Sequence, residues 1–306
     1  MEPGFSSRER PRALFAGLCT LDIIQSVAYV PAANEKVTAL RQAVAAGGPA
    51  TNAAVTFAYL GGQATLLTGV GAHPLAEGIR ADLRLAGVDL IDAAGNDGAS
   101  PPVSSIMVTA RSGERSVVSL NAAGRALRPP ARLRAMVDCA QIVLIDAHHG
   151  GLALAAARAA RAHGRLCILD GGSWRDGTPD LLPLVDVAVC AAGFRPPGTS
   201  TTRQKLDYLL GSGVGWAAIT NGAAPITWAG PGVRGQIPVP AVTVADTLGA
   251  GDILHGAFAY AICERRGLDP AGFRSALEFS AKVAASACES FGTRTWMRSG
   301  SRPWDR

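Results

Sequence analysis

Short apolar segments alternate with segments of helical periodicity along most of the chain. Apolar runs typical of strands buried on both faces occur at 13–19, 64–70, 141–145, 166–169, 185–189 and 215–220. Apolar residues spaced at helical intervals predict helices at 50–60, 75–86, 152–163, 202–210 and 270–288. Because strands and helices that alternate in this way form a parallel sheet covered on both faces, the sequence predicts an α/β/α sandwich.

Two other parts of the chain show neither pattern. The segment 23–45 has short extended stretches interrupted by Pro31 and Asn34. The segment 102–121 has two β-rich stretches joined by the turn-forming residues 110–115, which is typical of a hairpin. We therefore expect these two segments to form a small second sheet, a lid, beside the sandwich.

Composition sets limits on the class of protein. Of 306 residues, 48% are hydrophobic and 17% are charged, which excludes a disordered chain and allows a large core. We expect one domain over 13–295, with loose ends at 1–12 and 298–306. The net charge of +5 is spread along the chain, so it favours small anionic ligands over a nucleic-acid surface.

Cysteine spacing and hydropathy indicate the compartment. The six cysteines lie far apart without a Cys-x-x-Cys pair, which favours buried free thiols over disulfides or zinc. Residues 1–12 carry charge and proline but no apolar core of a signal peptide, and no uninterrupted 20-residue apolar span occurs. We expect a cytoplasmic protein with no membrane partner.

The most informative stretch is a glycine turn late in the chain. Gly249 and Gly251 precede apolar residues at helical spacing, so a helix is expected to begin at the glycines. The first turn of a helix offers free N–H groups and the positive end of the helix dipole, which together bind anions. Asp252 next to such a site can accept a proton from an attacking hydroxyl. An ordinary loop with an acidic N-cap has the same local pattern.

The longer sequence around this turn narrows the choice. Residues 246–252 read Asp-Thr-Leu-Gly-Ala-Gly-Asp and are followed by His-Gly-Ala at 255–257. This string resembles the signature of the ribokinase-like sugar kinases of the PfkB family, and the resemblance extends over 13–295. It implies a ribokinase-like three-layer α/β/α sandwich with a small β-sheet lid.

The resemblance also implies an activity and a set of residues. Family members transfer a phosphoryl group from ATP, with its Mg²⁺, to a sugar hydroxyl, and often bind a monovalent cation. By resemblance Asp252 is the catalytic base, and the amides of Gly249, Ala250 and Gly251 form the anion hole. Thr247 is expected on the nucleotide side of the site.

An earlier motif resembles the sugar-binding signature of the same family. Gly47 and Gly48 are followed at the family's spacing by Asn52, and Asp22 follows the first predicted strand. By resemblance these four residues bind the acceptor, since a carboxylate can accept hydrogen bonds from two hydroxyls. From position alone Asp22 can equally be a turn cap, and Asn52 a polar residue of an ordinary first helical turn.

The predicted strand 215–220 ends in Thr220-Asn221-Gly222, which resembles the family turn beside the nucleotide phosphates. Hydroxyl and amide groups can donate to phosphate oxygens there. Asn-Gly is also a hairpin signal, so a simple turn into a strand at 225–228 explains the sequence equally well. Asp170 ends another strand and is expected to be a neighbour of the active site.

The sequence departs from the family in the residues expected near magnesium. Many members carry Asn-x-x-Glu after the strand at 185–189, whereas residues 190–194 here read Cys-Ala-Ala-Gly-Phe. No metal ligands are therefore assigned. Either Mg²⁺ is held by ATP, water and Asp residues elsewhere, or the activity is slow or altered, and the presence of Asp252 favours an active enzyme. The neighbouring His148 and His149 point opposite ways on an extended segment and lack a third ligand, so they indicate a metal site only weakly.

The sequence leaves the acceptor open. A sugar or sugar derivative is the first expectation, and a nucleoside kinase would share the whole scaffold. A non-catalytic sugar-binding relative would explain the missing Asn-x-x-Glu. An exposed edge of the lid sheet predicts a homodimer.

Overall fold

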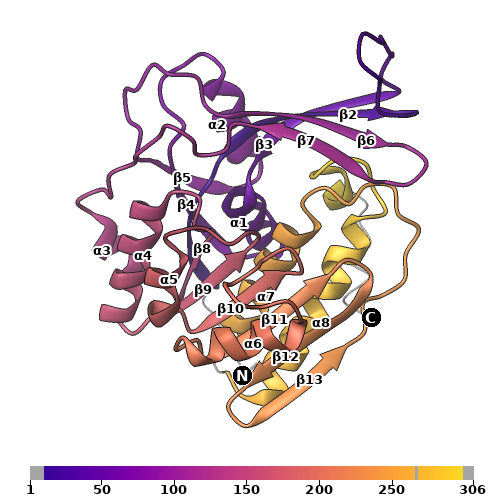
Figure 1. The fold of residues 1–306 in the computed structure, drawn as a ribbon. Coiled ribbons are helices and arrows are strands. Elements are labelled where there is room, and N and C mark those ends of the chain that lie inside the picture. Colours follow the sequence, from indigo (N-terminus) through magenta and orange to yellow (C-terminus); the bar gives the residue numbers. More distant parts are fainter. Residues whose placement is uncertain (1–9, 266–267, 299–306) are drawn as a thin grey trace, which may run out of the picture.

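The computed structural model describes residues 10–265 and 268–298, and it contains a nine-stranded sheet in the order β13-β12-β11-β10-β9-β8-β1-β4-β5 (Figure 1). Its strands are β1 (Arg12–Ala16), β4 (Gln63–Thr68), β5 (Val88–Asp92), β8 (Ile142–Ile145), β9 (Leu166–Gly171), β10 (Val187–Ala191), β11 (Trp216–Asn221), β12 (Ala224–Gly230) and β13 (Val233–Ile237). β12 and β13 pair antiparallel, so the sheet is mixed where the sequence predicted a parallel one.

Helices cover both faces of this sheet, which confirms the three-layer sandwich. In β1, Ala13 and Phe15 belong to one hydrophobic core, and Leu14 and Ala16 belong to the other. The first core is completed by α1 (Pro49–Tyr59), α2 (Ala76–Leu85), α7 (Ala250–Arg265) and α8 (Pro270–Ala287). The second is completed by α3 (Leu133–Cys139), α4 (Gly150–Ala162), α5 (Thr178–Leu181) and α6 (Thr202–Gly211). Burial on both faces explains why β1 is an apolar run.

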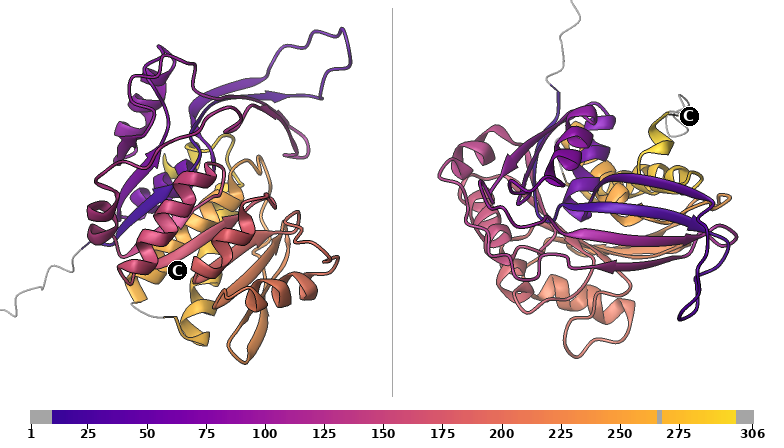
Figure 2. Two further views of the ribbon diagram at one scale, coloured as in Figure 1. Left: turned by 60° about the vertical axis from the view of Figure 1, so that its left-hand side comes forward. Right: turned by 90° about the horizontal axis from the view of Figure 1, so that it is seen from above.

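A second, four-stranded sheet stands beside the first (Figure 2). Its order is β3 (Arg41–Gly47), β2 (Thr20–Val27), β6 (Val103–Thr109) and β7 (Arg115–Ser119). Since β1 ends at Ala16 and β2 begins at Thr20, the small sheet grows out of the carboxyl edge of the large one. In open α/β sheets that edge is where ligands bind.

The ends of the fold differ from the expectation in detail. Residues 1–9 and 299–306 lie outside the described residues, but Arg12 is part of β1 and Arg298 is part of the short helix η2 (Thr295–Arg298). Among the described residues, no helix combines the length and the apolar character needed to cross a bilayer.

Candidate active site

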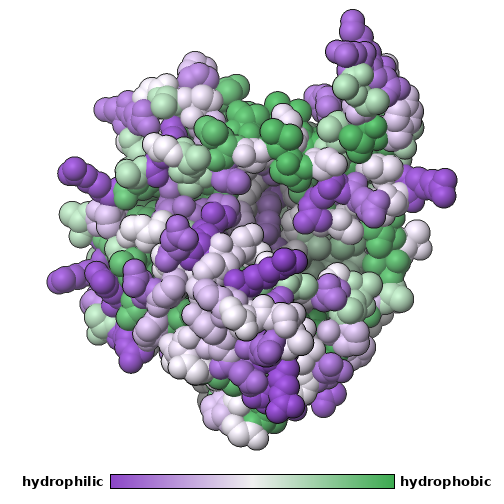
Figure 3. All heavy atoms as spheres, viewed as in Figure 1, coloured by the Kyte–Doolittle hydropathy of each residue, from purple (hydrophilic) through white to green (hydrophobic). Residues whose placement is uncertain are grey.

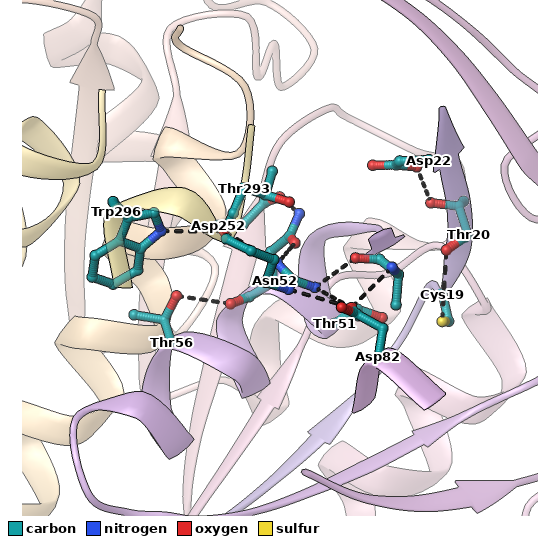
Figure 4. Close-up of polar contacts among 12 residues, drawn as sticks. Cys19, Thr20, Asp22, Thr51, Asn52, Thr56, Asp82, Asp252, Thr293 and Trp296 are labelled. Atoms are coloured by element: carbon teal, nitrogen blue, oxygen red, sulfur yellow. Dashed lines mark hydrogen bonds and ion pairs between the residues drawn. The ribbon is translucent and has the colours of Figure 1, made fainter. Parts of the chain in front are cut away.

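A hollow opens beneath the small sheet, with hydrophilic residues at its back and hydrophobic residues along its upper rim (Figure 3). Two helices that carry the predicted motifs are in contact with each other near it: α1 follows Gly47 and Gly48, and α7 follows Gly249. Figure 4 shows that Asn52 of α1 points toward Asp252 of α7, while Asp22 projects from β2. The structure thus brings the early and the late motif together.

The glycine turn forms the N-terminus of α7. Gly249 has φ of 73°, a conformation that favours glycine, and a Cβ atom there would lie 3.4 Å from Nδ2 of Asn52. The amide of Ala250 donates to the carbonyl of Thr247 at 3.3 Å. The amides of Gly251 and Asp252 follow in the first helical turn, where α-helical geometry supplies no intrahelical acceptor. An anion can therefore meet N–H groups and the positive helix end at this point.

Asp252 lies in the first turn of α7 and accepts a hydrogen bond of 2.9 Å from Nδ2 of Asn52. Burial, and then the nearby charge of Asp170, raise the pKa of Asp252 to about 7 against the opposing effects of Asn52, His255 and Arg115. A carboxylate with a pKa near neutrality is well matched to accept a proton at physiological pH.

The orientation of Asn52 is fixed by a half-buried arginine. Nη1 of Arg294 donates to Oδ1 of Asn52 at 3.0 Å, which leaves Nδ2 of the amide to face Asp252. Nη2 of Arg294 donates to the carbonyl of Ala46 at 2.6 Å and forms an ion pair of 3.1 Å with Oδ2 of Asp82. The sequence reasoning missed Arg294 and Asp82, which lie 212 residues apart and share no motif.

Asp22 lies inside β2, which corrects the expectation that it follows the first strand directly. Its side chain is buried and accepts a hydrogen bond of 2.6 Å from Oγ1 of Thr20, and burial raises its pKa. A Cβ atom on Gly47 would lie 1.9 Å from Oδ2 of Asp22, so only glycine lets β3 pass this close to the carboxylate. Gly48 has φ of 95° and turns the chain into α1, where its carbonyl accepts from the amide of Asn52 at 2.9 Å.

Asp146, at the end of β8, anchors the beginning of α1. Its Oδ2 accepts from the amides of Leu18 at 2.7 Å and Ala50 at 3.1 Å, and its Oδ1 accepts from the amide of His148 at 2.9 Å. The predicted strand 141–145 ends directly before Asp146, for which the sequence indicated no role. The carboxylate holds the loop after β1, the start of α1 and the end of β8 in one arrangement.

The predicted nucleotide residues have partners within the protein. Thr220 and Asn221 are the last two residues of β11, and Gly222 lies in the turn into β12, so this sequence does form a hairpin. Oγ1 of Thr247 donates to the carbonyl of Gly113 at 3.1 Å and accepts from Nη1 of Arg115 at 3.0 Å. Thr247 therefore joins the glycine turn to the β6–β7 hairpin of the small sheet.

Asp246 ties together two loops next to the glycine turn. One carboxylate oxygen accepts from the amide of Leu248 at 2.8 Å and the other from the amide of Gly292 at 2.9 Å. Within residues 10–265 and 268–298, no group of three or more His, Cys, Asp or Glu side chains is arranged to hold a metal ion.

Comparison with known proteins gives this arrangement a family. The model of the pfkB family carbohydrate kinases matches residues 12–299. The chain belongs to the pfkB family. Among solved structures it resembles a "putative ribokinase" from Agrobacterium tumefaciens, with 28% identity, a TM-score of 0.83 and 94% of each chain covered. The ribokinase of Giardia lamblia has 18% identity and a TM-score of 0.83 over 94% of this chain and 96% of that chain.

A further match shows the fold shared with another kind of kinase. The adenosine kinase of Sinorhizobium meliloti has 20% identity and a TM-score of 0.76, covering 93% of this chain and 96% of that chain. The family and these neighbours establish a carbohydrate kinase of ribokinase-like fold.

Proposed function

We propose that this kinase transfers the γ-phosphoryl group of ATP to a hydroxyl of a sugar or sugar derivative, with Asp252 as the base. The observation that carries the proposal is the 2.9 Å hydrogen bond between Asn52 and Asp252. It joins the acceptor motif to the phosphoryl motif across 200 residues of sequence, at the N-terminus of α7.

The acceptor binds beneath the small sheet in this proposal. The carboxylate of Asp22 and the side-chain amide of Asn52 orient its hydroxyls, and the backbone amides of Gly47 and Gly48 contact the sugar. Asp252 then accepts the proton of the attacking hydroxyl. The small sheet covers the site and keeps water from competing with the acceptor.

ATP binds on the other side of Asp252. The amides of the 249–251 turn stabilise the charge of the transferred phosphoryl group, and Thr220, Asn221, Gly222 and Thr247 lie along the path of the nucleotide. An Arabidopsis thaliana ribokinase complexed with ribose and ATP shares the fold, with 21% identity, a TM-score of 0.73 and coverage of 94% of this chain and 99% of that chain. Because ATP is the phosphoryl donor in this proposal, we expect the enzyme to work in the cytoplasm.

In this proposal Mg²⁺ binds together with the nucleotide. Among the described residues, no group of three or more His, Cys, Asp or Glu side chains could hold a metal ion, so Mg²⁺ would be bound through the ATP phosphates. Both carboxylate oxygens of Asp246 already accept backbone N–H groups, so this side chain organises the loops around any monovalent cation. A requirement for K⁺ is tested by assaying turnover in tetramethylammonium buffers with and without KCl.

The test is a coupled ADP-release screen over sugars, sugar phosphates, sugar acids and nucleosides, with Asp252→Asn as the control. The proposal predicts turnover with a sugar-type acceptor and its loss in the variant. Turnover with adenosine and none with free sugars would establish a nucleoside kinase instead. Thermal stabilisation by a sugar without any ADP release would indicate a non-catalytic binding protein.

We also propose a homodimer formed through the small sheet. Large apolar side chains are exposed on this sheet and its ends, among them Val44, Val118 and Leu120 at 55%, 72% and 67% exposure. Exposed apolar clusters of this kind mark association surfaces. Light scattering behind size-exclusion chromatography should give twice the mass of the chain, and Val118→Lys should return it to a monomer.

A further inference from the structure

A buried histidine lies one helical turn behind the proposed base. His255 of α7 is only 5% exposed, and its two ring nitrogens face backbone carbonyl oxygens. Nδ1 lies 2.7 Å from the oxygen of Gly251, and Nε2 lies 2.9 Å from the oxygen of Val189 in β10. A carbonyl oxygen only accepts, so both contacts are hydrogen bonds only when both ring nitrogens carry hydrogen.

The counter-charge for such a ring lies beside it. Oδ2 of Asp170, near the end of β9, is 3.3 Å from Nδ1 of His255 and has no hydrogen-bond partner among the residues that the structure describes. Asp170 is 5% exposed. A ring that donates from both nitrogens would carry a positive charge, and the Asp170 carboxylate lies where it can balance that charge. The pair joins α7 to two neighbouring strands of the large sheet.

The contact with Gly251 gives the pair a place in the active site. The carbonyl of Gly251 belongs to the same peptide as the N–H of Asp252, which lies in the first turn of α7. A cationic donor on the carbonyl side polarises this peptide and makes its N–H a stronger donor toward an anion. It also fixes the peptide from which the side chain of Asp252 projects.

We propose that His255 and Asp170 act as a positioning pair, in which a doubly protonated imidazole held by the Asp170 carboxylate orients the Gly251–Asp252 peptide. The inference rests on the proposed role of Asp252 as the base. Neither residue touches the substrate. The pair acts through the peptide that it holds.

A role in stability alone does not explain the pair. Replacing a buried ion pair by apolar residues of similar size is often neutral or stabilising, since each charge loses its hydration on burial. Both charges do influence the base: Asp170 raises the pKa of Asp252 and His255 lowers it. A pair placed this close to the reacting carboxylate has an effect on catalysis that a distant buried pair lacks.

Kinetics of three variants test the proposal. His255→Leu should lower kcat by about ten- to a hundredfold, the range expected when a catalytic group is displaced by a fraction of an ångström to 1 Å. The KM values for ATP and acceptor should change by less than about threefold, because the pair acts in the transition state. His255→Asn keeps a donor at the place of Nδ1 and should recover part of kcat. Asp170→Asn should lower kcat in wild type but have little further effect in His255→Leu, since the two residues act as one unit.

A matched control separates positioning from folding. Cys263→Ala changes another buried side chain of α7, 7% exposed and two turns further from the glycines. It should lower the melting temperature without lowering kcat. If His255→Leu retains kcat within twofold of wild type, or if its loss matches that of Cys263→Ala at equal stability, the proposal is wrong.

Nitrogen NMR of the histidine side chains gives a readout independent of activity. With His255→Asn used to assign the signal, the wild-type ring should show two protonated nitrogens at pH 7, and Asp170→Asn should abolish one of them. A neutral ring in wild type would overturn the pair even if the enzyme is active. Absence of turnover with every acceptor, or full turnover by Asp252→Asn, would instead refute the proposed function, and the NMR result would still decide the state of the ring.

Discussion

The hydrogen bond from Asn52 to Asp252 should set the pH range in which the enzyme works. Nδ2 of Asn52 donates at 2.9 Å and lowers the pKa of the carboxyl, which the surrounding burial has raised to about 7. Replacement of Asn52 by the isosteric leucine removes this donor. A hydrogen bond to a charged group contributes about 1.5–3 kcal/mol, and 1.36 kcal/mol corresponds to one pKa unit. The pKa of Asp252 should therefore rise by about one to two units.

The assay is the pH dependence of kcat/KM for the acceptor, measured by coupled ADP release. A general base works in its deprotonated form, so kcat/KM of wild type should fall tenfold per pH unit below about pH 7. In Asn52→Leu this acid limb should move to about pH 8–9. Loss of contacts between Asn52 and the acceptor lowers the height of the profile but leaves the position of the limb unchanged.

Thr56→Val is the matched control for this experiment. Oγ1 of Thr56 donates to the backbone carbonyl of Asn52 at 2.8 Å, so the variant alters the same helix without touching Asp252. Its acid limb should stay at the wild-type pH. If the limb of Asn52→Leu also stays there, or moves to lower pH, the carboxylate that titrates in the profile is not hydrogen-bonded to Asn52.

Four further variants test the turn, the hairpin and the charge of the base. Gly249→Ala should lower the melting temperature, because the φ of 73° at Gly249 is strained for alanine. In Gly251→Ala no atom lies within 4 Å of the new methyl group, so the variant should fold normally. It should nevertheless lose kcat if the phosphoryl group binds there. Full activity of Gly251→Ala would contradict the anion hole. Arg115→Ala removes the contacts of 3.0 and 3.2 Å to Thr247. Two hydrogen bonds of about 1 kcal/mol each correspond to about thirtyfold, so kcat/KM should fall by up to about thirtyfold while ATP hydrolysis without acceptor rises. Arg111→Ala on the same hairpin should change neither. Because the pKa of Asp252 is raised in the folded protein, its ionisation destabilises the fold as pH rises from about 4 to 7. In denaturant titrations at pH 8, Asp252→Asn should therefore be more stable than wild type by a few kcal/mol. Below pH 4 the variant should be no more stable than wild type.

The segments predicted best were those whose burial is visible in their own pattern of apolar residues. β1 and β8 are buried on both faces and appear as apolar runs, and α7 shows its period directly after the glycines. β5 and β13 were missed because both are edge strands of the large sheet. β13 reads Val-Arg-Gly-Gln-Ile, in which exposed residues alternate with half-buried ones before a buried Ile237, and only its pairing with β12 makes it a strand.

The same distinction applies to the active site. The two glycine motifs were found because each is local, and the structure joins them through Asn52 and Asp252. Arg294, which orients Asn52, was missed because its partners come from α2 and from the end of β3. Asp22 was placed at the end of the first strand because the sequence does not show that β1 stops at Ala16 and a new sheet begins.

The most direct test of the account is the rate at which Asp252→Asn phosphorylates the acceptor found in the screen, followed by mass spectrometry of the sugar product at saturating ATP. Removal of a general base should lower kcat by about 10²- to 10⁴-fold while the variant stays folded and binds ATP as wild type does. A rate within tenfold of wild type would contradict the central claim that this carboxylate takes the proton of the attacking hydroxyl.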